Sequence, residues 1–219
     1  MKPLEFFFEF ASTYSYPAAS RIGALAERAG VSVAWRPFLL GPIFRSQGWN
    51  DSPFNLYEAK GRYMWRDLAR TCEGLGLPFR RPSAFPRNCL LAARVACHAQ
   101  DEPWAPEFVR RIYRANFAED LEISDPEVVA TVLEGMGRPR SVLEAAGSAE
   151  TKERLRAQTE RAAAGGILGA PRSARSCRAA AMVIISVGAE NLEESQEGLE
   201  RSALVAELSP QQLKVFQLL

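Results

Sequence analysis

Histidine is almost absent from the sequence, and cysteine is scarce and widely spaced. The chain of 219 residues has one histidine, His98, and four cysteines, Cys72, Cys89, Cys97 and Cys177. Zinc sites and Ser-His-Asp catalysis draw on several such side chains, so we expect neither a metal site nor a hydrolytic triad. No two cysteines have the Cys-x-x-Cys spacing of a redox pair, which excludes a thiol-disulfide oxidoreductase of that kind. We interpret the cysteines as buried apolar thiols in a reducing compartment.

Long apolar runs and an excess of charge of either sign are also missing. Lysine and arginine number 27 and aspartate and glutamate 26, which gives a net charge of +1. This balance predicts neither a nucleic acid nor an anionic membrane surface as a partner. No apolar run has the length of a membrane span, and the first residues show no signal-peptide pattern. We therefore expect a cytoplasmic protein, and 47% hydrophobic residues suffice for one globular domain with an insertion.

The first part of the chain predicts a strand, a helix and a second strand. Residues 4–10 are aromatic and apolar, as in a buried strand. From Tyr16 to Gly30 the apolar residues recur at steps of three and four, which predicts a helix. Residues 31–37 alternate through Val31, Val33 and Trp35, as in a second strand. Such a unit is a βαβ motif with a right-handed crossover.

A helical block follows this unit. Residues 36–55 are rich in glycine and proline and are predicted to form a loop. Apolar residues at helical spacing come next, and the Gly-rich stretch GGILGAP ends the block at Pro171. The sequence thus predicts an α/β protein whose βα unit is interrupted by a helical insertion of about a hundred residues. The predicted helices cover residues 56–75, 90–96, 104–115, 125–133, 141–146 and 150–164.

Two serines stand at the corner between the first strand and the first helix, in the stretch ASTYSYP. The backbone N–H groups and the positive end of the helix point toward Ser12, so a thiolate held there is favoured and its pKa falls. The Ser12 hydroxyl can donate a hydrogen bond to such a thiolate. The alternative for Ser12 is an ordinary helix N-cap, a role for which Ser15 is the more plausible candidate. Tyr14 and Tyr16 are candidates for the wall of a pocket or for the aromatic core.

Four separated segments of the sequence follow one another in the order found in a known family. They are FEFASTYSYPAA, NDSPFNLYEAKGRYMWRDLAR, GLPFRRPSAFPRN and YRANFAEDLEISDPEVV, and GILGAP follows them. Together they resemble the 2-hydroxychromene-2-carboxylate isomerase family. The segment GILGAP matches the Gly-x-Pro corner of that family. That family is similar to the kappa-class glutathione transferases and, more distantly, to disulfide oxidoreductases of the DsbA type. The resemblance covers residues 1–171.

The resemblance implies both a fold and an activity. The fold is a thioredoxin-like domain in two parts, residues 1–54 and 165–219, interrupted by a helical insertion domain, residues 55–164. The activity is the glutathione-dependent cis-trans isomerisation of a small aromatic acid such as 2-hydroxychromene-2-carboxylate, as in naphthalene-type catabolism. In the family the glutathione thiolate adds reversibly to an unsaturated carbon, the bond rotates, and the thiolate leaves. Because dimers are common in such families, a homodimer is a further expectation.

The resemblance also assigns residues to the glutathione site. Ser12 matches the serine that faces the sulfur, and Asn50 matches an asparagine that contacts glutathione, with an ordinary turn residue as the alternative. Ala170 would pair through its backbone with the cysteinyl part of glutathione, and its peptide bond to Pro171 would be cis. A carboxylate substrate could meet one cation of a basic and aromatic helix face, for which a solvated surface is the alternative: Lys60, Arg62, Tyr63, Trp65 and Arg66.

After Pro171 the sequence departs from the family pattern. Arg172, Arg175 and Arg178 fall where a buried central strand should begin, and unpaired charges are costly to bury there. Our hypothesis is a shift of reading frame in the coding sequence, which fails if no other frame encodes a family-like end. Three functions stay open on the sequence alone: the isomerase, a kappa-type transferase that uses the same serine but ends in conjugation, and a non-catalytic remnant.

Overall fold

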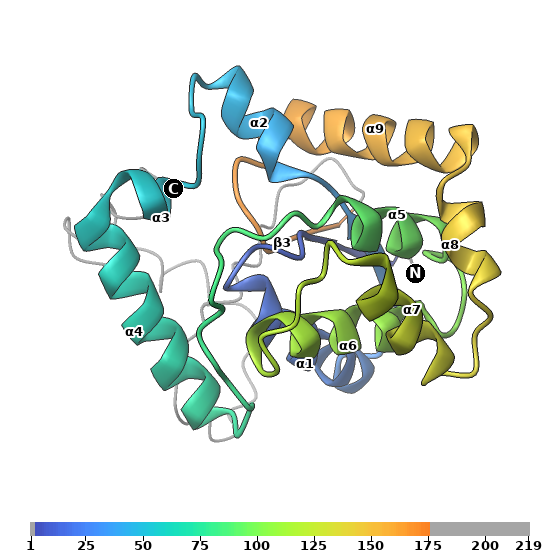
Figure 1. The fold of residues 1–219 in the computed structure, drawn as a ribbon, viewed down its shortest axis with the longest axis horizontal. Helices are drawn as coiled ribbons and strands as arrows, with labels where there is room; N and C mark the ends of the chain where they lie inside the picture. The colour runs from blue at the N-terminus through green and yellow to red at the C-terminus, as the bar shows by residue number, and fades with distance from the viewer. Residues whose placement is uncertain (1–2, 176–219) are drawn as a thin grey trace. The chain divides into compact units, whose positions relative to one another are not determined.

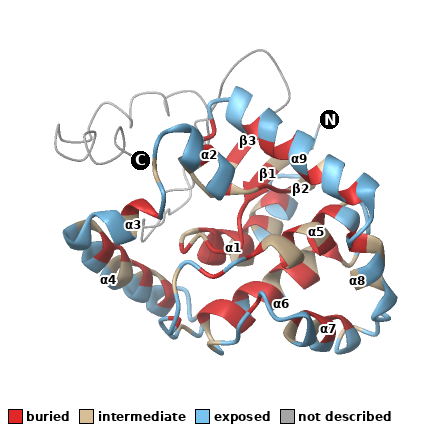
Figure 2. Ribbon diagram, turned by 45° about the horizontal axis from the view of Figure 1, so that its top comes forward, coloured by how far each residue is buried: buried red, intermediate tan, exposed pale blue. Residues whose placement is uncertain are grey.

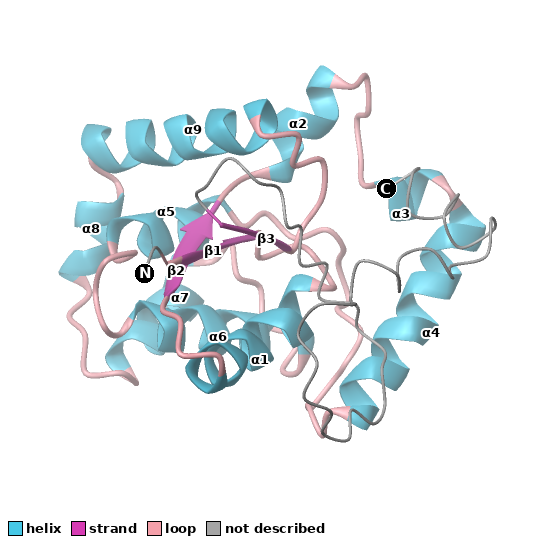
Figure 3. Ribbon diagram, turned by 180° about the vertical axis from the view of Figure 1, so that it is seen from behind, coloured by secondary structure: helices cyan, strands magenta, loops and turns pink. Residues whose placement is uncertain are grey.

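The computed structural model describes residues 3–175 of the chain. A three-stranded sheet in the order β2-β1-β3 lies among helices (Figure 1, Figure 3). Strand β2 is parallel to β1, whereas β3 is antiparallel to it. The elements are, in chain order, β1 Leu4–Phe8, α1 Ser15–Arg28, β2 Val33–Pro37, α2 Leu40–Ser46, α3 Pro53–Leu56, α4 Glu58–Gly74, α5 Leu90–His98, α6 Ala105–Phe117, α7 Pro126–Glu134, α8 Ser141–Ala146, α9 Ala149–Ala164 and β3 Arg172–Arg175.

The Phe6–Phe8 part of strand β1 is apolar on both faces because it is covered on both. Side chains alternate across a strand, so Phe6 and Phe8 enter one hydrophobic cluster and Phe7 enters another. The larger cluster joins Phe6 and Phe8 to residues of α1 and α6, and the smaller one joins Phe7 to α2 and α9. Figure 1 shows these two pairs of helices on opposite sides of the sheet, and Figure 2 shows the buried residues gathered around it. A fully covered central strand explains the continuous aromatic run of the sequence.

Helices of the predicted insertion share this core with the predicted thioredoxin-like part. The Phe117 ring of α6 stacks on two tyrosine rings. Its centroid lies 6.3 Å from that of Tyr113, also of α6, and 5.7 Å from that of Tyr16 of α1. All three residues belong to the larger cluster around β1. The insertion therefore stabilises the strand that carries the serine corner, while the proposed domain limits at residues 54 and 164 stay a prediction.

The connector before α5 is anchored by a buried arginine. The Arg87 side chain is 3% exposed and donates to the Asn116 carbonyl at 3.2 Å and the Asn116 Oδ1 at 3.0 Å. It also forms an ion pair with Asp120 and lies 3.4 Å from a carboxylate oxygen of Glu122. Asn116 in turn donates through Nδ2 to the Phe10 carbonyl at 3.0 Å. This network ties the connector and the end of α6 to the segment that follows β1.

Most of the predicted elements are confirmed, and two were missed, the helices α2 and α3. The βαβ unit and the six predicted helices are present, with ends that differ by a few residues. The segment predicted to be a loop contains α2, whose buried Leu40 and Ile43 pack beneath Phe7, so tertiary packing prevails over its Gly41-Pro42 pair. No helix within residues 3–175 combines the length and the apolar character that a membrane crossing requires.

Strand β3 begins at the arginines where the sequence departs from the family pattern. Arg172 pairs with Phe7 and Ser173 with Phe6, and the Ser173 side chain is buried. A strand thus forms at the point where the burial of unpaired arginines was expected to be costly. The rest of the departure, including Arg178 and Cys177, lies outside the described residues, as does any outcome of the reading-frame hypothesis.

Candidate functional site

The serine corner is a tight turn between β1 and α1. The Ser12 N–H donates to the Glu9 carbonyl at 3.0 Å, and the Ser15 N–H donates to the Ser12 carbonyl at 3.2 Å. Tyr14 occupies the N-cap position of α1, and its side chain makes no capping hydrogen bond. Neither serine is therefore the cap: the expected capping role of Ser15 is wrong, because Ser15 is already the first residue of the helix and is fully buried.

The Ser12 hydroxyl connects the corner to the other end of the described chain. It donates to the Ala170 carbonyl at 2.9 Å, across 158 residues of sequence. The peptide bond between Ala170 and Pro171 is cis, as the resemblance implies. Pro171 leads directly into β3, which pairs with β1. Three of the four predicted site residues, Ser12, Ala170 and Pro171, are thus brought together.

The start of α1 offers an electropositive setting beside Ser12. No acidic residue occurs in the first turn of this 14-residue helix. Within residues 3–175 the backbone N–H groups of Thr13 and Tyr14 make no hydrogen bond. Free N–H groups at a helix start favour an anion through hydrogen bonding and through the helix dipole. Ser12 itself is partly exposed, so an external anion can reach it.

Tyr14 extends from the corner to the helices α3 and α4. Its hydroxyl donates to Asp67 Oδ2 at 2.8 Å, and its ring lies 6.5 Å from that of Phe54. Burial and the Asp67 carboxylate raise the pKa of Tyr14 far above its ordinary value, so its phenol stays protonated. Lys60 lies over the Phe54 ring at 5.9 Å, and the nearby Tyr63 is 63% exposed. These residues form an aromatic group with a lysine, which extends from the corner through Tyr14 and which we call the Tyr14 wall: Tyr14, Phe54, Lys60 and Tyr63.

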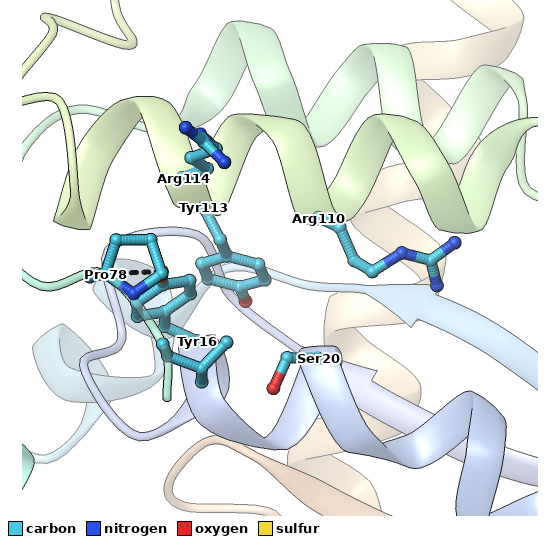
Figure 4. A pocket seen from close by; sticks show the side chains of 7 residues that line it. Tyr16, Ser20, Pro78, Arg110, Tyr113 and Arg114 are labelled. Atoms are coloured by element: carbon cyan, nitrogen blue, oxygen red, sulfur yellow. Dashed lines mark hydrogen bonds between the residues drawn. The ribbon is translucent and has the colours of Figure 1, made fainter. Parts of the chain in front are cut away.

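Tyr16 belongs to the core and not to that wall. It is 4% exposed, and its hydroxyl donates to the Pro78 carbonyl at 2.7 Å. One edge of its ring borders a surface hollow of about 140 Å³, which Figure 4 shows between α1 and α6. The hollow includes Arg110 and Arg114, which are paired with Glu107 and Glu119. It contains none of the predicted site residues.

Asn50 is not brought to the corner by any contact of the described residues. It is exposed in the loop between α2 and α3 and makes no hydrogen bond there. Its predicted contact with glutathione stays a prediction. On the predicted basic face, Arg62 forms an exposed ion pair with Glu58, Arg66 is exposed, and Lys60 lies over the Phe54 ring of the Tyr14 wall.

Two buried side chains, Glu9 and Cys89, meet beneath the corner, and the sequence predicted only the burial of the thiol. Glu9 is 7% exposed; its Oε2 accepts from the Ala11 N–H at 3.0 Å and its Oε1 from the Cys89 thiol at 3.1 Å. Burial raises the pKa of Glu9 to about 7, against hydrogen bonds from Cys89, Ala11 and the nearby Ser12 N–H, which lower it. Burial likewise raises the pKa of the Cys89 thiol well above its ordinary value. The only sign of Glu9 in the sequence was an acidic residue within an aromatic run. In a strand, alternate side chains can face solvent, so this residue gave no reason to expect burial.

The corner fits the sulfur and adjoining backbone of a thiol peptide such as glutathione. Ser12 can donate to a thiolate, and the Ala170 carbonyl that now accepts from Ser12 can accept from a peptide N–H instead. Within residues 3–175 the corner has no thiolate of its own, since Cys72, Cys89 and Cys97 are buried and their raised pKa values keep them as thiols. The thiolate would therefore have to be supplied by a ligand.

Comparisons with known proteins give a consistent set of relatives. The family model of the DsbA-like thioredoxin domain matches residues 3–203. Glutathione s-transferase kappa 2 of Caenorhabditis elegans is 27% identical over 180 residues, which cover 78% of this chain and 79% of that protein. The solved structure of 2-hydroxychromene-2-carboxylate isomerase is similar with a TM-score of 0.69 and 26% identity, covering 78% of this chain and 83% of that one. The cytosolic disulfide reductase DsbM from Pseudomonas aeruginosa shares the fold, with a TM-score of 0.58 and 18% identity over 80% and 85% of the two chains.

Proposed function

The chain belongs to the family of DsbA-like thioredoxin domains, and on that premise we propose that it is a glutathione-dependent isomerase of small aromatic acids. The proposed substrates are aromatic acids like 2-hydroxychromene-2-carboxylate, the compound in the name of the similar solved structure. The observation that carries the proposal is the hydrogen bond from Ser12 to the Ala170 carbonyl, because it places a hydroxyl donor at the start of α1, where residues 3–175 place no free thiolate.

Glutathione, when bound, supplies the thiolate nucleophile that adds reversibly to an unsaturated carbon. The residues of this chain hold and orient the reactants. Ser12 donates a hydrogen bond to the sulfur, and the start of α1 lowers the free energy of its anionic form. The Ala170 backbone fixes the peptide next to the sulfur, and its carbonyl exchanges the Ser12 donor for a donor of the ligand.

The Tyr14 wall suits the other reactant. An aromatic acid needs an apolar, aromatic contact surface and a cation for its carboxylate, and Phe54, Tyr14 and Lys60 supply both. The hydrogen bond from Tyr14 to Asp67 of α4 holds the Tyr14 ring beside Phe54. Nothing in this arrangement oxidises the substrate, and the thiol is regenerated at the end of each turnover.

Replacement of Ser12 by alanine tests the proposal. We expect kcat/KM with 2-hydroxychromene-2-carboxylate and glutathione to fall about 10- to 150-fold, because a hydrogen bond to a charged group is lost. Ser20→Ala is the matched control: this serine lies in α1, the helix that follows the corner, donates to the Pro17 carbonyl at 2.8 Å, and should leave the rate unchanged. Equal activity of Ser12→Ala and wild type would remove Ser12 from the mechanism.

A second candidate is a kappa-type glutathione transferase, favoured by the relative from Caenorhabditis elegans. Both functions use the same corner, so the amount of free thiol after turnover separates them. The isomerase returns all glutathione, whereas conjugation consumes one thiol per product. The non-catalytic alternative predicts no heat and no thermal stabilisation when glutathione is titrated at millimolar concentration.

A further inference from the structure

The Glu9 carboxyl is buried beneath the serine corner without a cation beside it. Its side-chain partners among the described residues are the Ala11 N–H and the Cys89 thiol. None of the ion pairs within residues 3–175 includes Glu9. An ionised carboxylate without a cation is costly to bury, whereas a protonated carboxyl is not. The geometry alone therefore favours a neutral Glu9 in a position where the proposed isomerisation makes no use of it.

Glu9 is joined to Ser12 through the backbone of the corner. Its carbonyl accepts both the Ser12 N–H at 3.0 Å and the Tyr113 hydroxyl at 2.9 Å. Its carboxyl holds the N–H of Ala11, the residue before Ser12. The carboxyl thus lies within the same short turn that would hold a thiolate. Two negative charges so close together in a water-poor site repel each other strongly.

Among the titratable side chains in this part of the core, Glu9 is the one that exchanges a proton near neutral pH. The titratable side chains that face it are Cys89, at the start of α5, and Tyr113, from α6. Burial raises the pKa of both well above their ordinary values, so both stay protonated. Glu9, whose pKa is raised to about 7 by burial, is divided between its two forms at neutral pH.

We propose that Glu9 is a positioning residue that takes up a proton when an anion occupies the Ser12 corner, so that glutathione binding as a thiolate is coupled to protonation of Glu9. The proposal rests on glutathione being the ligand. No bond to carbon or sulfur is made or broken in this step, apart from the S–H bond of the thiol: the thiol gives up its proton, and Glu9, through solvent, gains one. The thiolate is then held beside a neutral carboxyl and not beside a second negative charge.

Proton linkage of binding is the direct test. The full chain is titrated with glutathione at pH 7 in buffers of different ionisation enthalpy, which gives the number of protons released per glutathione bound. Since the pKa of Glu9 is about 7, wild type should release up to about half a proton fewer than Glu9→Gln. With S-methylglutathione, which cannot form a thiolate, the two proteins should release the same number.

Glu5→Gln is the matched control, because Glu5 is an acidic residue of β1 that is paired with Arg36 and Arg161. It should show the proton release of wild type. If wild type and Glu9→Gln both bind glutathione and release equal numbers of protons, the coupling is overturned while the glutathione-dependent function stands. If wild type binds no glutathione, the function and the coupling fail together.

A measurement on wild type alone keeps the test decisive if Glu9→Gln does not fold. The infrared band of a protonated carboxyl should grow when glutathione binds at pH 7, and it should not grow with S-methylglutathione. A band that is unchanged by bound glutathione would overturn the coupling. A merely structural hydrogen-bonding role for Glu9 would move neither the proton release nor this band.

Discussion

Arg87 and Glu9 are both buried ionisable side chains, yet only Arg87 is surrounded by groups of opposite charge. Arg87 meets Asp120, Glu122 and the oxygens of Asn116, whereas Glu9 meets a thiol and a backbone N–H. A compensated charge is fixed in one form and can serve only to hold structure. An uncompensated one keeps the ability to gain or lose a proton, which is what a site that receives an anion can use.

Breaking the compensated site should have the largest effect. Arg87→Met is expected to lower the free energy of unfolding by about 3–5 kcal/mol, because the ion pair of the buried guanidinium is lost and the buried oxygens of Asn116 lose their donor. Urea unfolding followed by circular dichroism measures the loss. Arg80→Met is the control: Arg80 contacts the same carboxylate at 3.5 Å but is 67% exposed, so its loss should cost less than about 1 kcal/mol. Equal costs for the two variants would show that burial does not strengthen the Arg87 ion pair.

Removing the charge from the uncompensated site should have a smaller effect that depends on pH. The pKa of Glu9 is about 7 in the folded chain and near 4.5 when exposed, so its protonation supports folding fully below pH 4.5. That contribution is lost as the pH rises through 7 and amounts to about 3 kcal/mol. Glu9→Gln cannot ionise, so its stability relative to wild type should rise by this amount between pH 4.5 and pH 8. A difference that does not change with pH would show that Glu9 titrates normally.

Changing the one side-chain donor of Glu9 should have the smallest effect. Cys89→Ser offers a stronger donor to the carboxylate, so it should lower the pKa of Glu9 and stabilise the ionised form by about 0.5–1.5 kcal/mol. The midpoint of the pH dependence of stability would then move to lower pH. Cys97→Ser, at a fully buried thiol of the same helix, should reduce stability without moving that midpoint. An unmoved midpoint in Cys89→Ser would break the link between the thiol and the carboxyl.

Much of the fold could be predicted because periodicity and helix-ending residues are local signals. Helix α7 illustrates this: Asp125 precedes Pro126, and its side chain accepts from the Glu127 N–H at 2.9 Å, as an N-cap does. Helix α2 was missed because its stability comes from packing on Phe7, and its local residues favour a turn. Residue preferences within a short window do not report contacts across the sheet.

The site was predictable only in part, for a related reason. Ser12 stood out because its position follows from the strand and helix on either side of it. Its partner Ala170 came from a family resemblance, since no periodicity relates residues 158 positions apart. Glu9 and Arg87 were missed because a charged residue is ordinarily taken as solvated, and their burial depends on α5 and α6 closing over them. The proton chemistry of the corner is thus a property of the packed molecule.

Because β1 lies between β2 and β3, its two partner strands are synthesised at very different times. Strands β1 and β2 are synthesised within the first 37 residues and can pair at once. The second edge of β1 has no partner until residues 172–175 have emerged, and Ser12 has no acceptor until residue 170 has. For most of synthesis the nascent chain therefore carries an aromatic strand with one open edge, which is the kind of edge that pairs with strands of other chains. The first strand to be made therefore waits for its second partner until about 170 residues have been synthesised.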